Sequence, residues 1–387
     1  MKKLVRKITA GALLATVAAF NVVAVTGCGG DSVVIDDSVT EGGDVVKQDL
    51  IIYNWGEYIA EDTIERFEEV YPEYNVIYRT FETNETMYPT LDNTYDVIVP
   101  SEYMVCRLIN EEKIQPLDWS LLPTASQYMD PMFRDLRYAE DDALSNSVLD
   151  YAVPYLYCTV GLVYDANKIT IPEGTTDPQV IWDIVFDQAN AGQIGMYDSM
   201  RESIGVALNY LGYSLNSMDE SQLNEALQLL ISQKENLNPA YGVDNLKDKM
   251  ASGELAASIA WSGDHIVMLD RIEELGKEDE IDLRFVLPEN SKWAVDMMCI
   301  PTNAANVEGA HKFIDFMYDP DIALANCEYV GYSTPNTAAK AMLDPEVANN
   351  VYYYPTAEIF STLEVYFTSS VIEERYTELW NTVKASA

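Results

Sequence analysis

The chain has 387 residues, of which 24 are Lys or Arg and 63 are Asp or Glu, and its formal net charge is −39. This excess of acid disfavours nucleic acid and anionic lipid as partners of the protein surface, and it would steer cationic solutes toward it. The length is enough for the cores of two domains of ordinary size.

The N-terminus predicts export. Basic residues within 1–7 precede a mostly apolar stretch, 8–25, which is short for a membrane-spanning helix and ends in small residues. The sequence VTGC at 25–28 resembles a bacterial lipobox. This resemblance implies that 1–27 is a lipoprotein signal peptide and that Cys28 carries a lipid, which would hold the chain at the outer face of the cell membrane. Residues 28–48 are rich in Gly, Asp and Ser and predict an acidic flexible tether.

The folded part is expected to begin near residue 49 with a strand over 50–53, which is apolar and β-branched. Trp55, Glu57 and Tyr58 follow at once, and Gly56 permits a tight turn. In open α/β sheets ligands bind just beyond the carboxyl ends of strands. Aromatic rings around a carboxylate would suit an organic cation there, although a solvated turn with one core tryptophan fits the same residues.

Apolar periodicity predicts the remaining elements in chain order. They are a helix over 60–71, a strand over 75–81, a short helix over 87–91, a strand over 95–99, a helix over 104–112, strands over 152–164 and 194–197, a helix over 219–234, strands over 255–261, 283–287 and 293–301, and helices over 307–318, 321–329 and 371–385. The first part, β-α-β-α-β, is typical of a sheet covered by helices. The apolar run 152–164 is long enough to cross from one domain to another.

Several strand ends repeat the chemistry of the first. Ser101 and Tyr103 follow the strand at 95–99, where Ser101 could equally cap a helix. Asp198 and Glu202 follow the strand at 194–197, where Glu202 could serve only the dipole of the next helix. The remaining polar or aromatic residues at such positions are Trp261, Asp264 and Tyr332.

Asp296 is the only charged residue in the apolar run 293–301. A carboxylate inside such a strand is costly to bury unless a positive group meets it. We therefore expect Asp296 to have a functional role.

These candidates are acids and aromatics, with hardly any base or nucleophile. A protonated amine over an aromatic face gains about 0.5–2 kcal/mol, and a charge-assisted hydrogen bond to a carboxylate contributes about 1.5–3 kcal/mol. Several acids along a groove would suit a ligand with several ammonium groups. A carboxylate pair beside aromatic rings could instead hydrolyse a glycoside, but nothing in the sequence fixes such a pair.

No cofactor or metal is expected. The two histidines, His265 and His311, are far apart, and no metal-spaced cluster, phosphate-binding loop or nucleophile elbow occurs. The cysteines beyond Cys28 form no CxxC pair and are interpreted as free buried thiols. They are Cys106, Cys158, Cys299 and Cys327.

From about residue 49 onward the chain resembles the spermidine/putrescine-binding proteins of polyamine ABC transporters. The motifs that carry the resemblance are YNWGEY (53–58), FETNETMYPTL (81–91), YDVIVPSEYMV (95–105), AWSGD (260–264), DMMCIP (296–301) and GYSTPN (331–336). The resemblance implies an α/β, two-lobed type II periplasmic-binding-protein fold, in which each lobe is a sheet flanked by helices and a hinge joins them. It places lobe one at 49–153 and 297–342, and lobe two at 154–296 and 343–387.

The resemblance also implies a function without catalysis. The protein would capture spermidine or putrescine between its lobes and deliver it to an ABC permease with its ATPase. A receptor for another solute, such as a cationic amino acid or a sugar, is the alternative, with a glycoside hydrolase behind it. The ligand-binding residues carried over by motif are Trp55, Glu57, Tyr58, Ser101, Tyr103, Asp198, Glu202, Trp261, Asp264, Trp293, Asp296 and Tyr332.

Two positions depart from the family pattern. Asp198 is followed by Ser199, where family members often carry a second acid. Trp293 stands three residues before Asp296, whereas the family's aromatic residue stands one or two before the acid.

Overall fold

A computed structural model describes residues 47–367 and 369–386. The expected signal peptide, the lipidation residue Cys28 and nearly all of the tether lie outside the described residues. Among the described helices, none combines the length and the apolar character that crossing a bilayer requires.

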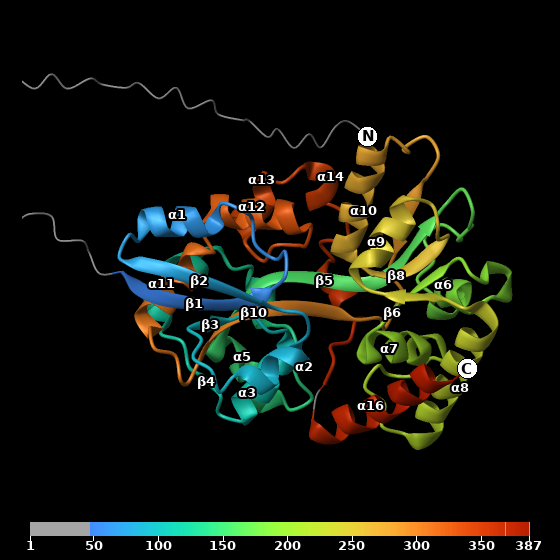
Figure 1. The fold of residues 1–387 in the computed structure, drawn as a ribbon, viewed down its shortest axis with the longest axis horizontal. Helices are drawn as coiled ribbons and strands as arrows, with labels where there is room; N and C mark the ends of the chain where they lie inside the picture. The colour runs from blue at the N-terminus through green and yellow to red at the C-terminus, as the bar shows by residue number, and fades with distance from the viewer. Residues whose placement is uncertain (1–46, 368, 387) are drawn as a thin grey trace, which may run out of the picture. The chain divides into compact units, whose positions relative to one another are not determined.

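The chain alternates strands and helices from its first described element (Figure 1). The strands are β1 (Gln48–Trp55), β2 (Tyr74–Phe81), β3 (Val97–Ile98), β4 (Ile114–Gln115), β5 (Ala152–Asp165), β6 (Ile194–Tyr197), β7 (Ala240–Gly242), β8 (Ala257–Trp261), β9 (Leu283–Val286) and β10 (Trp293–Pro301). The α-helices are α1 (Thr63–Val70), α2 (Asn84–Met87), α3 (Glu102–Asn110), α4 (Pro123–Tyr128), α5 (Asp142–Tyr151), α6 (Pro178–Phe186), α7 (Met200–Tyr210), α8 (Glu220–Leu237), α9 (Asp244–Ala251), α10 (Ser262–Leu275), α11 (Val307–Phe316), α12 (Pro320–Val330), α13 (Thr337–Met342), α14 (Pro345–Ala348), α15 (Ala357–Phe360) and α16 (Ser370–Ala385). Short 3₁₀ helices are η1 (Tyr88–Thr90), η2 (Trp119–Leu121), η3 (Pro131–Arg134) and η4 (Gln188–Asn190).

These elements match the predicted ones in type and order, with small shifts of the ends. The strand expected over 95–99 shortens to Val97–Ile98, and the short helix expected over 87–91 divides into α2 and η1.

The four cysteines of the described residues are buried and free, which confirms the prediction that they are free buried thiols.

The strands join into one sheet with the order β2-β1-β3-β10-β5-β8-β6-β7, to which β4 and β9 add at β10 and β5. β1 is parallel to β2 and β3, and β6 is parallel to β7 and β8, whereas β10 and β5 run antiparallel to their neighbours. Figure 1 shows β5 and β10 through the middle of the fold, with α1, α12 and α10 on one side and α3, α7 and α16 on the other. Both faces of the sheet are therefore covered by helices.

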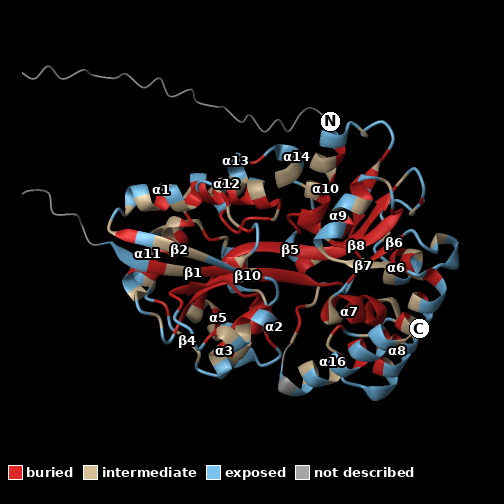
Figure 2. Ribbon diagram, viewed as in Figure 1, coloured by how far each residue is buried: buried red, intermediate tan, exposed pale blue. Residues whose placement is uncertain are grey.

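β5 and β10 are interior strands. All 14 residues of β5 are buried, as a near-continuous apolar run predicts for a strand covered on both faces (Figure 2). The register between β10 and β5 shifts at one point: Asp296 pairs with Leu156, but the next residue, Met297, pairs with Pro154. Tyr155 is thus the extra residue of a bulge, a feature that bends a strand and redirects its side chains.

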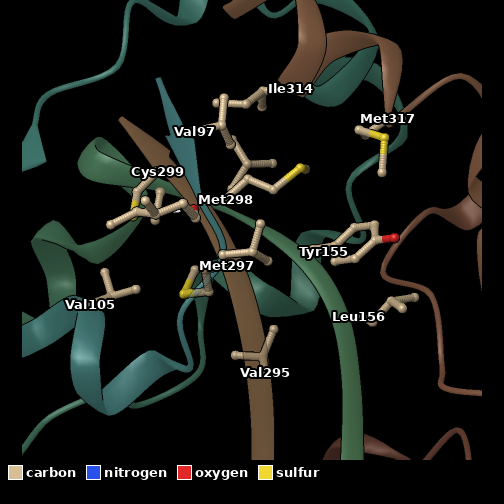
Figure 3. Packing of buried hydrophobic residues seen from close by; sticks show 14 of the residues in the cluster. Val97, Val105, Tyr155, Leu156, Val295, Met297, Met298, Cys299, Ile314 and Met317 are labelled. Carbon is tan, nitrogen blue, oxygen red and sulfur yellow. Dashed lines mark hydrogen bonds between the residues drawn. The ribbon is translucent and has the colours of Figure 1, made fainter. Parts of the chain in front are cut away.

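The buried apolar residues form two clusters, which meet along β5. Its residues 155–157 belong to the first cluster, together with β1, β3, α3 and β10, and Val160, Leu162 and Val163 belong to the second, together with β6, α7, α8 and α16. Figure 3 shows side chains of β10 on both faces of the strand, with Val105 beyond one face and Ile314 and Met317 beyond the other. The lobe boundaries given above stay a prediction.

Candidate functional site

Asp296 on β10 is the centre of the candidate site. Its Oδ2 accepts a hydrogen bond from Tyr58 Oη at 2.7 Å, and its Oδ1 accepts one from Ser101 Oγ at 2.7 Å. Asp296 keeps part of its surface accessible although it lies deep in the protein. This enclosure raises the pKa of its carboxyl, against the opposing effects of the two hydroxyls and of the charge of Lys292. No Lys or Arg among the described residues forms an ion pair with it.

Local structure brings both hydroxyls to Asp296. Ser101 stands at the N-cap position of α3, but its side chain makes no capping hydrogen bond, and a β-bridge joins it to Asp296. The capping interpretation of Ser101 is therefore wrong for its hydroxyl. Tyr58 is held from the other side, because its carbonyl accepts a hydrogen bond from Tyr155 Oη at 2.8 Å.

Aromatic rings surround the Tyr58 ring. The ring centroids of Tyr155, Tyr332 and Trp55 lie 5.7, 5.6 and 6.5 Å from that of Tyr58. The indole of Trp55 is fixed because its Nε1 donates to the carbonyl of Val99 at 2.8 Å. These rings present π faces and edges next to a carboxylate that has no cationic partner among the described residues.

Tyr332 is positioned by the end of a helix. α12 begins with Pro320 after the Asp319 cap and ends at Gly331, whose φ of 82° is the left-handed conformation that favours glycine. The chain turns there and lays the Tyr332 ring on the backbone of Gly263 in the first turn of α10.

Tyr103 belongs to a polar chain beside Ser101. Asn84 Nδ2 donates to Ser101 Oγ at 3.1 Å and to Tyr103 Oη at 2.8 Å. Tyr103 Oη in turn donates to Glu85 at 3.0 Å. Asn84 therefore orients two of the predicted residues.

Asp264 and Trp261 form a second group, at the junction of β8 and α10. Tyr197 Oη donates to Asp264 Oδ2 at 2.7 Å, and the Tyr197 and Trp261 ring centroids lie 4.4 Å apart. Burial raises the pKa of Asp264, and Lys247, with its Nζ 3.6 Å from Oδ1, acts in the opposite direction. Asp264 thus has a cation of the protein itself nearby.

Glu202 lies in the first turn of α7 and is buried. Its Oε1 pairs with Lys292 Nζ at 2.9 Å, and its Oε2 accepts a hydrogen bond from Tyr366 Oη at 3.0 Å. The predicted ligand contact is therefore already occupied by a lysine in this structure.

Glu57 and Asp198 are exposed, and neither side chain makes a hydrogen bond or ion pair within 47–367 and 369–386. Glu57 has a φ of 50°, the left-handed region that non-glycine residues rarely adopt. The structure does not join either acid to the group around Asp296.

Trp293 is a core residue. It is 3% exposed, and its ring packs edge-on against Tyr138 and Phe360 at centroid distances of 5.8 and 5.4 Å. Side chains alternate along a strand, so Trp293, three residues from Asp296, belongs to the opposite face. The structure does not place Trp293 beside Asp296, contrary to our expectation.

Glu102, which no sequence motif singled out, is fully buried. Its Oε2 accepts a hydrogen bond from the Val295 amide at 3.0 Å, and its Oε1 has no partner. Burial raises the pKa of Glu102 to about 7, with Lys292 acting in the opposite direction and Asp296 adding to the rise. Other residues that the motifs did not reveal are Asn84, Tyr155, Tyr197, Lys292 and Tyr366.

Comparison with known proteins identifies the family. The family described as bacterial extracellular solute-binding protein matches residues 64–354. The chain belongs to this family. Its relatives include the spermidine/putrescine-binding periplasmic protein of Escherichia coli (strain K12), which is 33% identical over 341 residues, covering 85% of this chain and 91% of the relative. The putrescine-binding periplasmic protein PotF of the same organism is 28% identical over 353 residues, covering 88% and 92%.

Solved structures of this family share the fold. The spermidine/putrescine ABC transporter substrate-binding protein PotD from Streptococcus pneumoniae is 34% identical, with a TM-score of 0.71 over 87% of this chain and 99% of that chain. The sheet flanked by helices and the two apolar clusters are thus those of a two-lobed solute-binding protein. Such relatives are extracytoplasmic binding proteins rather than enzymes.

Proposed function

We propose that this protein is a receptor that captures a polyamine, spermidine or putrescine, and delivers it to an ABC permease. The observation that carries the proposal is Asp296, an enclosed carboxylate with two hydroxyl donors and no cationic partner among the described residues. An alkylammonium would supply the missing charge, and the neighbouring rings of Tyr58 and Tyr332 would cover its methylenes.

The relatives support this choice of ligand, because their names specify spermidine and putrescine. The chain's acidic balance supports it as well, since a surface of charge −39 attracts cations. The hydroxyls of a sugar could donate hydrogen bonds to this carboxylate, but a neutral sugar would not supply the positive charge that it lacks. We also propose that no step of catalysis takes place at the site.

The cell-surface setting belongs to the same proposal. Residues 1–27 would be removed as a lipoprotein signal peptide, and a lipid on Cys28 would keep the receptor at the outer face of the membrane. The tether would let the folded part reach the permease subunits, whose ATPase drives uptake.

Titration calorimetry with spermidine and putrescine tests the ligand. Binding of at least one polyamine in the micromolar range or tighter is expected, with arginine and glucose as controls for a cationic amino acid and a sugar. A folded protein that binds neither polyamine at high micromolar concentration would refute the proposal.

Asp296→Asn tests the site. The substitution keeps the shape and removes the charge, so polyamine affinity is expected to fall by about tenfold to hundredfold, the value of a charge-assisted hydrogen bond. Asp198→Asn changes an exposed acid from the same predicted set and should cost much less. Equal affinities of Asp296→Asn and the unmodified protein would show that this carboxylate does not hold the amine.

A further inference from the structure

Lys292, just before β10, occupies a site made of an acid and an aromatic ring. Its Nζ lies 2.9 Å from Glu202 Oε1 and 4.0 Å from the centroid of the Tyr366 ring. The exposed fractions of Lys292, Glu202 and Tyr366 are 6%, 5% and 2%. The pair is therefore shielded from water, unlike a surface salt bridge.

A lysine side chain is itself an alkylammonium, so its contacts show which cation this place accepts. A carboxylate and the face of an aromatic ring are the two groups that bind one end of an amine ligand well. The cavity beside the pair, lined in part by Gly205 and Ser291, has a volume of about 10 Å³, room for about one water molecule. A second ammonium group with its methylenes does not fit there while Lys292 is in place.

The charge of Lys292 also excludes a second ammonium group from this place. Burial would lower the pKa of Lys292, but Glu202 and Glu102 together raise it above its ordinary value, so the side chain is a cation. A ligand ammonium at Glu202 would be repelled by this charge. Moving Lys292 away would instead leave a buried cation without its partner, which proteins rarely tolerate.

Asp296, unlike Glu202, has no lysine paired with it in the described part of the chain. The hydroxyls of Tyr58 and Ser101 donate hydrogen bonds to its carboxylate, and no ion pair to Lys or Arg forms within the described residues. The charge of Lys292 acts on Asp296 only through space, and this effect is weaker than that of either hydroxyl. One predicted acid is thus open to a ligand cation, and the other is satisfied by the protein itself.

We propose, on the basis of the function proposed above, that Lys292 permanently fills one amine subsite, so that this receptor selects a diamine over a triamine. Lys292 then acts as a tethered substitute for the ammonium group that a longer polyamine would place at Glu202. The number of ligand charges that the site accepts is reduced by one.

The experiment measures the ratio of putrescine to spermidine affinity by calorimetry on the full chain. The unmodified protein is expected to bind putrescine at least tenfold more tightly. Lys292→Met keeps the length of the side chain and frees Glu202, so the ratio should shift at least tenfold toward spermidine. Adding Glu202→Gln to that variant removes the freed acid and should abolish the shift.

Lys312→Met is the matched control. Lys312 Nζ also lies near a carboxylate, 3.3 Å from Glu73, and near an aromatic ring, 5.2 Å from the centroid of Tyr74, but it is on α11, away from the candidate site. This variant should leave the ratio unchanged. A preference of the unmodified protein for spermidine, or an unchanged ratio in Lys292→Met, overturns the inference. Binding of neither amine to the unmodified protein refutes the proposed function itself.

Lys292→Met leaves a buried carboxylate unpaired, so its folding is measured as well. If the variant does not fold alone, thermal unfolding is followed with each amine present. Spermidine is expected to restore a cooperative transition and putrescine is not. Equal rescue by both amines, or rescue by neither, overturns the inference.

Discussion

At the scale of single residues, the site combines acids in three different states. Asp296 is open to a cation, Glu202 is paired with Lys292, and Glu102 has one oxygen without a partner. Each state follows from burial and from the nearest donor rather than from residue type. Listing acids at strand ends therefore does not by itself define the ligand contacts.

Glu102 should make stability depend on pH. Its pKa is about 7 in the folded protein, against an ordinary 4.5, so the fold favours the protonated form. The stabilisation from that proton is complete below pH 4.5 and is lost as the pH rises through 7. Glu102→Gln mimics the protonated acid, and at pH 8 it should raise the free energy of unfolding by roughly 3 kcal/mol relative to the unmodified protein.

Denaturant unfolding of both proteins between pH 4.5 and pH 8 checks this prediction, because the difference between them isolates Glu102 from other titrating groups. The two curves should nearly meet at pH 4.5 and separate toward pH 8. Glu278→Gln, at an exposed position, is the control and should leave the curve unchanged. A constant difference across the range would contradict the prediction.

The sequence predicted some of these residues and could not predict others. Tyr58 and Ser101 were found because each stands where an apolar run meets polar residues, and Asp296 because it is the only charged residue inside an apolar run. Tyr366 lies in a segment without periodicity, and it reaches Glu202 from 164 positions away. Lys292 pairs with an acid 90 positions earlier, and only the folded chain shows that contact.

At the scale of elements, periodicity gave the type and order of the elements that it predicted, but it did not reveal β4, β7, α6, α9 and α10. The apolar run of β5 predicted a strand that crosses between two domains, and β5 does contribute to both apolar clusters. The bulge at Tyr155 was out of reach, since it arises from pairing with β10. The face occupied by Trp293 follows from alternation along β10, in keeping with a spacing from Asp296 that departs from the family pattern.

The contact between α10 and the turn after α12 yields a prediction. A Cβ at Gly263 would clash with the Tyr332 ring, so Gly263→Ala should displace that ring from the site. Loss of one aromatic face should weaken polyamine binding several-fold, up to about thirtyfold. Overpacking of this kind costs about 1–3 kcal/mol. The better helix propensity of alanine offsets at most about 1 kcal/mol of it, so some loss of stability is expected as well.

Calorimetry and thermal unfolding measure the two effects of Gly263→Ala. Gly56→Ala is the matched control, since a Cβ at Gly56 would meet no atom within 4 Å, and Gly56 also lies in a turn of the candidate site. The control should bind normally. Equal affinities of the two variants would show that the position of Tyr332 does not matter for the ligand.

At the scale of the whole folded part, the two apolar clusters are joined at more places than β5. Arg107 on α3 pairs with Glu373 on α16 at 2.8 Å, and these helices belong to the first and the second cluster. The side chains are 22% and 23% exposed, so the pair is partly screened by water. We expect it to favour the closed arrangement in which the site residues are enclosed.

Glu373→Gln should therefore weaken polyamine binding without changing any residue of the candidate site. A partly exposed ion pair contributes at most about 1 kcal/mol, so less of the protein would be closed and the apparent affinity should fall by at most about fivefold. Because salt screens the pair, the effect should shrink at high ionic strength. Glu220→Gln breaks the pair with Arg375 between α8 and α16, inside the second cluster, and should leave affinity unchanged. Calorimetry at low and high salt measures the polyamine affinity of both variants. Equal affinities of Glu373→Gln and Glu220→Gln would exclude a role of the Arg107 pair in closure.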